Sequence, residues 1–228
     1  MISVVSLWKQ IQTTAKSGTS GYQSQDEFNS DLATVQLRIA NVLCDNYHIS
    51  EKIEDALFGL IKSNTADTDT NGVFVMPTDY FRLIDLWYNL NGVPTPANKI
   101  SSNQISSYTT SYIRKPDLTK DSLGYYFMDS TLQVLPKTQV NATLVYCQKP
   151  PAASITLTAA SDSNSDYLTP TAGADLIWSP VVYNLFVYMM LEMLGIEMRD
   201  NILYEYATLG IPKEAYIGMS INTNQNAQ

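Results

Sequence analysis

The chain has 228 residues, 45% hydrophobic and 16% charged, which is the composition of a folded protein of one or two domains and excludes a large multidomain enzyme. Its formal net charge of −8 argues against a sequence-reading nucleic-acid binder, because such proteins normally carry a basic stripe that displaces counterions from phosphates. The 15 tyrosines, a high number for this length, suit either wide protein interfaces or positions in strands and core.

The sequence carries no sign of an oxidising compartment or of a membrane. Cys44 and Cys147 lie far apart and form no metal or redox motif, so both are predicted to be reduced core residues of a cytosolic protein. We expect no signal sequence, because the apolar stretch 4–8 is short and Lys9 follows it. No apolar run reaches membrane-spanning length.

Helical periodicity dominates the first 64 residues. A short amphipathic helix is predicted from the spacing of Val4, Leu7, Trp8 and Ile11. Ser24 and Glu27 form a capping-box signature ahead of an apolar stripe that runs from Phe28 to Leu43. A further helix is expected after Ser50, with its end near Asn64.

Strand patterns follow, separated by polar segments. Strands are predicted over residues 73–75, 83–88, 125–127, 132–135 and 142–146, the last three as an antiparallel meander. The polar segments 94–123 and 152–175 are predicted to be long loops with little regular structure. Two more helices are expected. One opens at Trp178 and Pro180 and is ended or interrupted at Gly195, and the other runs from about Arg199 to Leu209.

The predicted fold class is therefore α+β. A bundle of about four helices is expected from residues 1–72 and 176–212, with an inserted antiparallel β-rich domain over residues 73–151. Residues 152–175 would connect them as a loop. Residues 213–228 are too polar to form a core and are expected to be an extended tail.

Residues 67–72 match the first half of a calcium loop of the EF-hand type. Asp67, Asp69 and Asn71 would supply oxygens at alternate positions. The twelfth position is Thr78 instead of the usual bidentate glutamate, and the segment after the loop has a strand pattern. A plain turn from a helix to a strand is therefore favoured over a calcium site, and we expect no metal or cofactor.

Catalytic patterns are also absent from the sequence. His48 is the only histidine, and its position between two predicted helices favours a solvated or capping role. Neither a Walker loop nor a dinucleotide fingerprint occurs. Two groups of carboxylates favour solvated helix faces: Glu51, Glu54 and Asp55, and Glu192, Glu197 and Asp200. We therefore expect that the protein is not an enzyme, and we name no catalytic residue.

Three segments occur in a fixed order along the chain: Met76–Arg82 (MPTDYFR), Tyr146–Pro151 (YCQKPP) and Leu194–Asp200 (LGIEMRD). Together, over about residues 24–212, they resemble the head-to-tail adaptor, or ring, proteins of short-tailed phages, which include tail tubular protein A and the ring proteins of crAss-like phages. In that family a Pro-x-Asp-aromatic element leads into a β-region, a tyrosine followed by a basic residue and proline closes it, and helices flank both ends.

This resemblance implies a structural role for the residues that carry it: Pro77, Asp79, Tyr80, Arg82, Tyr146, Pro150, Gly195 and Asp200. The carboxylate of Asp79 is expected to cap the turn after Pro77 by accepting backbone N–H bonds. Pro150 is expected to end a strand, because proline cannot donate to the ladder.

The resemblance also implies a function. The protein would be a homo-oligomer, usually a ring of twelve, that binds the portal and other tail or ring proteins and surrounds double-stranded DNA in transit, without contacting a membrane. It would assemble in the host cytoplasm and remain in the virion. Four apolar residues of the tail are expected to bind a partner, the portal first: Tyr216, Ile217, Met219 and Ile221.

Two points stay open. The sequence lacks the obvious further inserted domain of the tail tubular proteins, so the ring layer is not fixed. A protein of another class remains the alternative: a small hydrolase or a carbohydrate-binding module with a β-domain.

Overall fold

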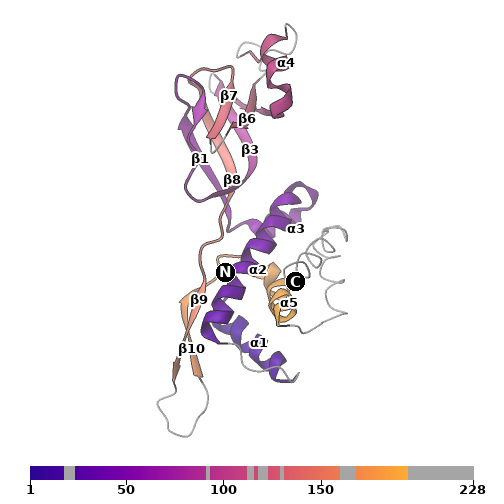
Figure 1. Cartoon of the computed structure of the whole chain (residues 1–228), viewed down its shortest axis with the longest axis vertical. Helices are drawn as coiled ribbons and strands as arrows, with labels where there is room; N and C mark the ends of the chain where they lie inside the picture. The colour runs from indigo at the N-terminus through magenta and orange to yellow at the C-terminus, as the bar shows by residue number, and fades with distance from the viewer. Residues whose placement is uncertain are drawn as a thin grey trace. The chain divides into compact units, whose positions relative to one another are not determined.

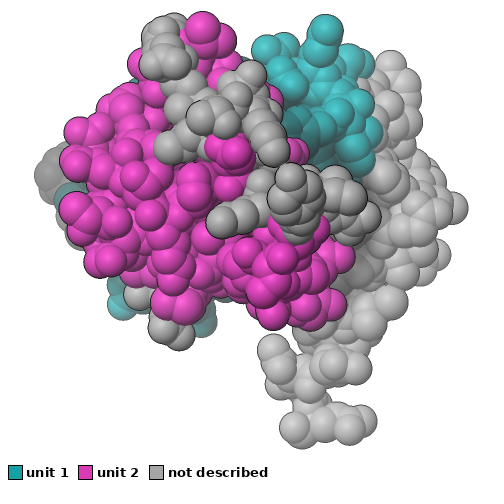
Figure 2. Space-filling model, turned by 90° about the horizontal axis from the view of Figure 1, so that it is seen from above, with its two compact units in different colours: residues 1–60, 149–228 teal, residues 61–148 magenta. Residues whose placement is uncertain are grey.

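The computed structural model describes residues 1–17, 24–90, 93–111, 116–117, 123–128, 131–159 and 168–194. It is a mixed α+β protein, as predicted. The chain divides into unit 1 (residues 1–60 and 149–228) and unit 2 (residues 61–148), which Figure 2 colours separately. The division falls after residues 60 and 148, whereas the sequence pattern placed it after residues 72 and 151. The predicted helix 199–209 and the tail 213–228 lie outside the described residues.

Helices from the start of the chain and from residues 183–193 pack together in unit 1 (Figure 1). Helices α1 (Val4–Ser17) and α2 (Gln25–Asp45) both pack on α5 (Tyr183–Met193). One turn of 3-10 helix, η4 (Pro180–Val182), directly precedes α5. Edge-to-face aromatic pairs contribute to this core: Trp8 and Phe28 at 5.0 Å, and Trp178 and Phe186 at 5.5 Å between ring centroids. Neither segment buries its apolar face alone.

The predicted start of α2 is confirmed. The hydroxyl of Ser24 accepts the N–H of Glu27, and Glu27 Oε2 accepts the N–H of Ser24 at 2.9 Å, so the capping box is complete. The apolar stripe that follows is buried: Phe28, Leu32, Val35, Ile39 and Leu43.

The helix after Ser50 is shorter than predicted. After the 3-10 turn η1 (Tyr47–Ile49), α3 (Glu51–Leu57) ends before the predicted Asn64, which lies in strand β1 (Ile61–Asp67). Two backbones approach closely just after the end of the helix. A Cβ atom at Gly59 would stand 2.1 Å from the carbonyl oxygen of Ile177, so only glycine fits here.

The predicted loop 152–175 is wrong, because β9 (Ser154–Ala159) and β10 (Leu168–Ala174) form an antiparallel hairpin. Side chains of α2 bind the free edge of β9. The amide of Asn29 both donates to the carbonyl of Ile155 (3.2 Å) and accepts its N–H (3.0 Å), and Gln25 Oε1 accepts the N–H of Leu157 (2.8 Å). These bonds and the burial of Ile155 hold a segment that looks like a polar loop in sequence.

Unit 2 contains two four-stranded sheets (Figure 1). The first has the order β1-β8-β3-β4 and is antiparallel, with β8 (Asn141–Gln148), β3 (Tyr80–Leu90) and β4 (Val93–Pro96). The second has the order β2-β7-β6-β5, with β2 (Val73–Phe74), β7 (Thr131–Leu135), β6 (Gly124–Met128) and β5 (Asn98–Lys99); only β5 and β6 pair in parallel.

One core joins the two sheets into a sandwich. Both sheets contribute inward-facing side chains to it, among them Phe74, Leu86, Tyr88, Tyr125, Leu132, Val134, Leu144 and Tyr146. The five predicted strands are confirmed in position. The predicted meander is wrong in its last step, because β6 pairs with β7 but β8 lies in the other sheet between β1 and β3.

The segment 94–123 is more regular than predicted. Its described part contains β4, β5, a 3-10 turn η2 (Ser102–Gln104) and the short helix α4 (Ile105–Thr110). Ile105 and Tyr108 stand one turn apart and pack against Ile100, Tyr126 and Leu135. A single apolar helical turn thus covers part of the outer face of the second sheet, a signal too short to stand out in a polar sequence.

Candidate functional site

The first two family-like motifs meet in unit 2. The hydroxyl of Tyr146 on β8 donates to Asp79 Oδ1 at 2.8 Å, and Lys62 Nζ on β1 donates to Asp79 Oδ2 at 2.7 Å. Sheet register creates this cluster, because Lys62 and Tyr146 are direct partners across β1 and β8. Asp79 immediately precedes β3, the other neighbour of β8. Sequence reasoning named Asp79 and Tyr146 but missed Lys62.

Electrostatics follow this geometry. The hydrogen bond from Lys62 and then that from Tyr146 lower the pKa of Asp79 below its ordinary value. Burial, followed by the neighbouring Asp79 carboxylate, raises the pKa of Tyr146 to about 12. The ion pair is open to water, with the Lys62 side chain 48% exposed and that of Asp79 35% exposed, so its net contribution to stability is small.

Asp79 does not play the predicted part of a backbone cap. The turn after Pro77 is closed by the N–H of Tyr80, which donates to the carbonyl of Pro77 at 3.1 Å. Both carboxylate oxygens of Asp79 accept from side chains instead. The ring of Tyr80 lies 5.9 Å from that of Tyr146, and burial raises the pKa of Tyr80. The motif therefore ties three strands together beside the core.

The remaining motif residues are dispersed. Arg82 lies on β3 opposite Cys147 of β8. Pro150 is buried and stands two residues after the end of β8. Gly195 and Asp200 lie outside the described residues, as do the four tail residues predicted to bind a partner, Tyr216, Ile217, Met219 and Ile221.

The calcium-loop candidate is a tight turn between β1 and β2. Asp69 Oδ1 accepts the backbone N–H groups of Asn71 (2.8 Å) and Val73 (2.7 Å), and these bonds, that of Val73 first, lower the pKa of Asp69. Gly72 has a φ of 77°, and Asp67 Oδ1 accepts from Asn141 Nδ2 at 2.8 Å. The carboxylate of Asp69 thus closes the turn, and that of Asp67 binds the neighbouring strand β8. No group of three or more His, Cys, Asp or Glu side chains suited to a metal occurs among the described residues.

The other polar candidates that the structure describes show no catalytic arrangement, and Glu197 and Asp200 lie outside the described residues. His48 is exposed in η1, and its ring contacts that of Tyr47 edge-on at 5.1 Å. Glu51, Glu54 and Asp55 are exposed on α3, as expected. Glu192 differs, because it is half-buried on α5 and burial raises its pKa.

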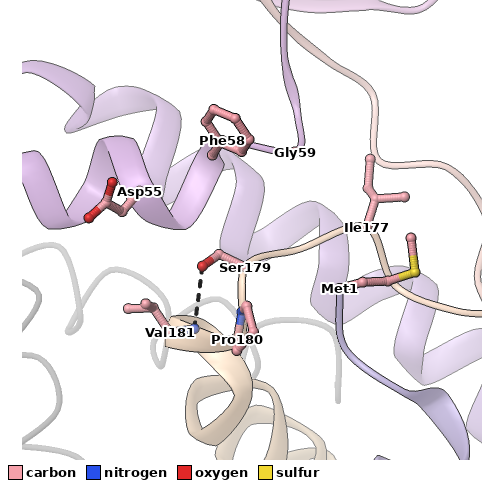
Figure 3. Close-up of a pocket in the computed structure, with 8 residues that line it drawn as sticks. All are labelled: Met1, Asp55, Phe58, Gly59, Ile177, Ser179, Pro180 and Val181. Atoms are coloured by element: carbon pink, nitrogen blue, oxygen red, sulfur yellow. Dashed lines mark hydrogen bonds between the residues drawn. The ribbon is translucent and has the colours of Figure 1, made fainter.

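An apolar cleft in unit 1 was not foreseen (Figure 3). It has a volume of about 350 Å³ and is lined by Met1, Asp55, Phe58, Gly59, Ile177, Ser179, Pro180 and Val181. Phe58 is 82% exposed although it is aromatic, and Met1 and Val181 on the same cleft are 76% and 54% exposed. The lining comes from three separate stretches of the chain, so no local pattern predicts it. The one sequence signal is that Phe58 follows directly on the buried Leu57, off the apolar face of α3.

Within the described part of the chain, no helix is both long and apolar enough to cross a membrane. Comparison with protein-family models and with curated proteins finds no match to this chain.

Proposed function

We propose that this protein is a subunit of a head-to-tail connector ring, a structural virion protein that joins head and tail. The observation that supports it best is the hydrogen bond between Tyr146 and Asp79. These residues belong to the two motifs on which the resemblance to adaptor proteins depends, and a shared role in one cluster gives both a physical reason to occur together. If the two short motifs matched the family by chance, there would be no reason for their residues to contact each other.

The architecture is compatible with the same proposal. Helices from both ends of the chain pack together in unit 1, and the β sandwich of unit 2 is inserted between them in sequence. In this proposal residues 199–209 supply the last helix of a bundle of about four helices, which also includes α2 and α5.

The proposed role is mechanical. Twelve copies would form a ring below the portal, bind other tail or ring proteins, and surround double-stranded DNA as it leaves the head. A closed ring requires heterologous contacts, in which two different patches of the subunit meet. The apolar tail residues from Tyr216 to Ile221 would contact the portal. Assembly would take place in the host cytoplasm and the protein would stay in the virion.

Purified particles test this proposal. We expect the chain to co-purify with them in a fixed ratio to the portal, near one to one if both rings have twelve subunits. A chain lacking residues 213–228 should fold normally and fail to enter particles, whereas changing the exposed Ile49 to serine should have no effect on incorporation. Particles that lack the protein would contradict the ring role. Particles that accept the shortened chain and deliver DNA normally would contradict the role of the tail in binding the portal.

A carbohydrate-binding module is the second candidate, and one observation favours it. Trp87 is 40% exposed on the first sheet, where it pairs with Thr143, which in turn pairs with Thr65. The two threonine hydroxyls lie 2.9 Å apart. An open indole beside a row of hydroxyl groups offers a stacking surface with hydrogen-bonding partners for a sugar. Binding to a glycan array that is lost on Trp87→Ala would favour this function over the connector.

A further inference from the structure

Three exposed apolar side chains of the described part of unit 1 line the cleft of Figure 3: Phe58, Met1 and Val181. Phe58 and Met1 are the two most exposed large apolar side chains there, whereas Ile49, which is also exposed, lies outside the lining. The fold gives no reason for Phe58, because the residues that α3 buries in its core are Ile53, Ala56 and Leu57. A large aromatic side chain held in water beside other apolar groups is the signature of a protein-binding site.

The cleft is also preformed. Gly59 and the carbonyl of Ile177 are in direct backbone contact, which fixes the end of α3 against the segment before η4. The hydroxyl of Ser179 accepts the N–H of Val181 and holds the other wall (Figure 3). Among the residues that line the cleft, Asp55 carries the one charged side chain, and Met1 carries the N-terminal ammonium group. A preformed apolar hollow with a carboxylate at its rim suits an apolar projection that carries a cation.

Unit 2 exposes side chains of that chemistry at one end of its second sheet. Phe74 pairs with Leu132, which pairs with Phe127, so the end of β2, the end of β6 and the start of β7 coincide. The exposed apolar side chains here are Val75 (78%), Met128 (50%) and Phe127 (37%). The ammonium group of Lys99, itself exposed, lies 5.7 Å from the centre of the Phe127 ring. We name Val75, Lys99, Phe127 and Met128 the sheet-end patch.

We propose that the cleft of one copy receives the sheet-end patch of a second copy, with Lys99 of that copy near Asp55. Each patch exposes apolar side chains that its own unit does not cover, and the charges at the two rims are opposite. The contact joins different surfaces of the two copies, so it is heterologous and can repeat around a closed ring. The contact itself does not depend on the proposed ring function; only the closure of repeated contacts into a ring rests on it.

Photo-crosslinking of the full chain tests the contact directly. Benzoylphenylalanine replaces Phe58, and unlabelled chain is mixed with ¹⁵N-labelled chain so that mass spectrometry separates crosslinks between copies from those within one. We expect crosslinks between copies to residues 73–76 or 124–131. The same group at Ile49, which is 55% exposed in unit 1 away from the cleft, should give none to these residues. Crosslinks within one chain, to residues 195–228, or to no protein residue would overturn the proposal.

Charge exchange gives an independent test. Self-association is measured by sedimentation velocity over a range of concentrations. Phe58→Ser should weaken it about tenfold or more with an unchanged Tm, because the side chain is mostly exposed in the single chain. Asp55→Lys and Lys99→Asp should each weaken it, and the two together should restore it. Glu54→Lys, on the same helix but outside the cleft, is the matched control.

The outcomes separate this contact from the connector function. If the chain is found in particles at a fixed ratio but residue 58 crosslinks elsewhere, the contact is wrong and the ring proposal stands. If copies crosslink as expected but the chain is absent from particles, the contact stands and the connector function fails. A chain that stays monomeric at every concentration, with no restoration by the double exchange, contradicts the contact.

Discussion

Tyr146 and Asp79 stand 67 residues apart in sequence and are joined by a hydrogen bond of 2.8 Å from the phenol hydroxyl to Oδ1. Because a carboxylate accepts this bond, it is stronger than one between neutral groups. Because the second carboxylate oxygen is bound by Lys62, one side chain connects β1, β8 and the start of β3. The phenol and the ammonium group thus hold the same carboxylate from two strands.

The two bonds to Asp79 should contribute unequally to stability. Tyr146→Phe removes a charge-assisted bond beside the core and is expected to lower the opening free energy of unit 2 by about 1–2 kcal/mol. Lys62→Met removes an exposed ion pair and should cost less than about 1 kcal/mol. Hydrogen exchange of the β3 and β8 amides measures both. A larger loss for Lys62→Met than for Tyr146→Phe would show that this ranking is wrong.

Acid should weaken the same cluster. The folded-state pKa of Asp79 lies below its ordinary value of 3.8, so the ionised carboxylate stabilises the fold above about pH 4 and this contribution is lost as the pH falls through the folded pKa. Compared with Asp79→Asn, the wild-type protein should be more stable near neutral pH, and the difference should shrink below about pH 4. Thermal unfolding against pH measures it. In a Lys62→Met background the difference should be smaller, because the bond from Lys62 is the main cause of the shift; an unchanged difference would contradict this cause.

Unit 1 should depend on its C-terminal segment. A chain ended at residue 175 lacks Trp178 and Phe186, whose rings pack on each other in the core, and it leaves the apolar faces of α1 and α2 uncovered. We expect an insoluble or molten product. Leu32→Ala, at a fully buried position of α2, should cost about 2–5 kcal/mol in the full chain. A shortened chain that is monodisperse and unfolds cooperatively would show that the two segments do not need each other.

Calcium should have no role in the turn between β1 and β2. Asp69 Oδ1 already accepts two backbone N–H groups, and Thr78 cannot supply the bidentate ligand of the twelfth position. Calorimetry should detect no binding tighter than about 10⁻⁵ M, the weak end of sensor sites. Asp69→Asn should lower the stability of unit 2 equally with and without calcium. A Tm that rises with calcium only when Asp69 is present would refute this.

The elements that could be predicted from the sequence are those whose patterns depend on residues close together in the chain. The capping box of Ser24 and Glu27 and the apolar stripe that follows predicted α2, because both depend on neighbours within one or two helical turns. The strand around Leu86 was predicted from its run of apolar and aromatic residues in the same way. The existence of most elements could therefore be predicted.

Long-range contacts account for what was missed. Nothing near Ile61 shows that it pairs with Cys147 in place of continuing a helix, and nothing near Ile155 shows that Asn29 will bind its backbone. At the candidate site, Asp79 was assigned the commonest local role of an aspartate near a turn, whereas its partners come from two other strands. The cleft around Phe58 arises from stretches that only the fold brings together.

The amide of Asn29 has a consequence beyond the hairpin that it holds. A two-stranded sheet ordinarily offers its outer strands as templates for any passing chain, and the resulting pairing leads to aggregation or domain swapping. At Ile155 the side chain of Asn29 takes both backbone groups as a neighbouring strand would, and Gln25 takes the N–H of Leu157. A helix thus takes the place of a neighbouring strand, and these backbone groups of β9 are not free to pair with another chain.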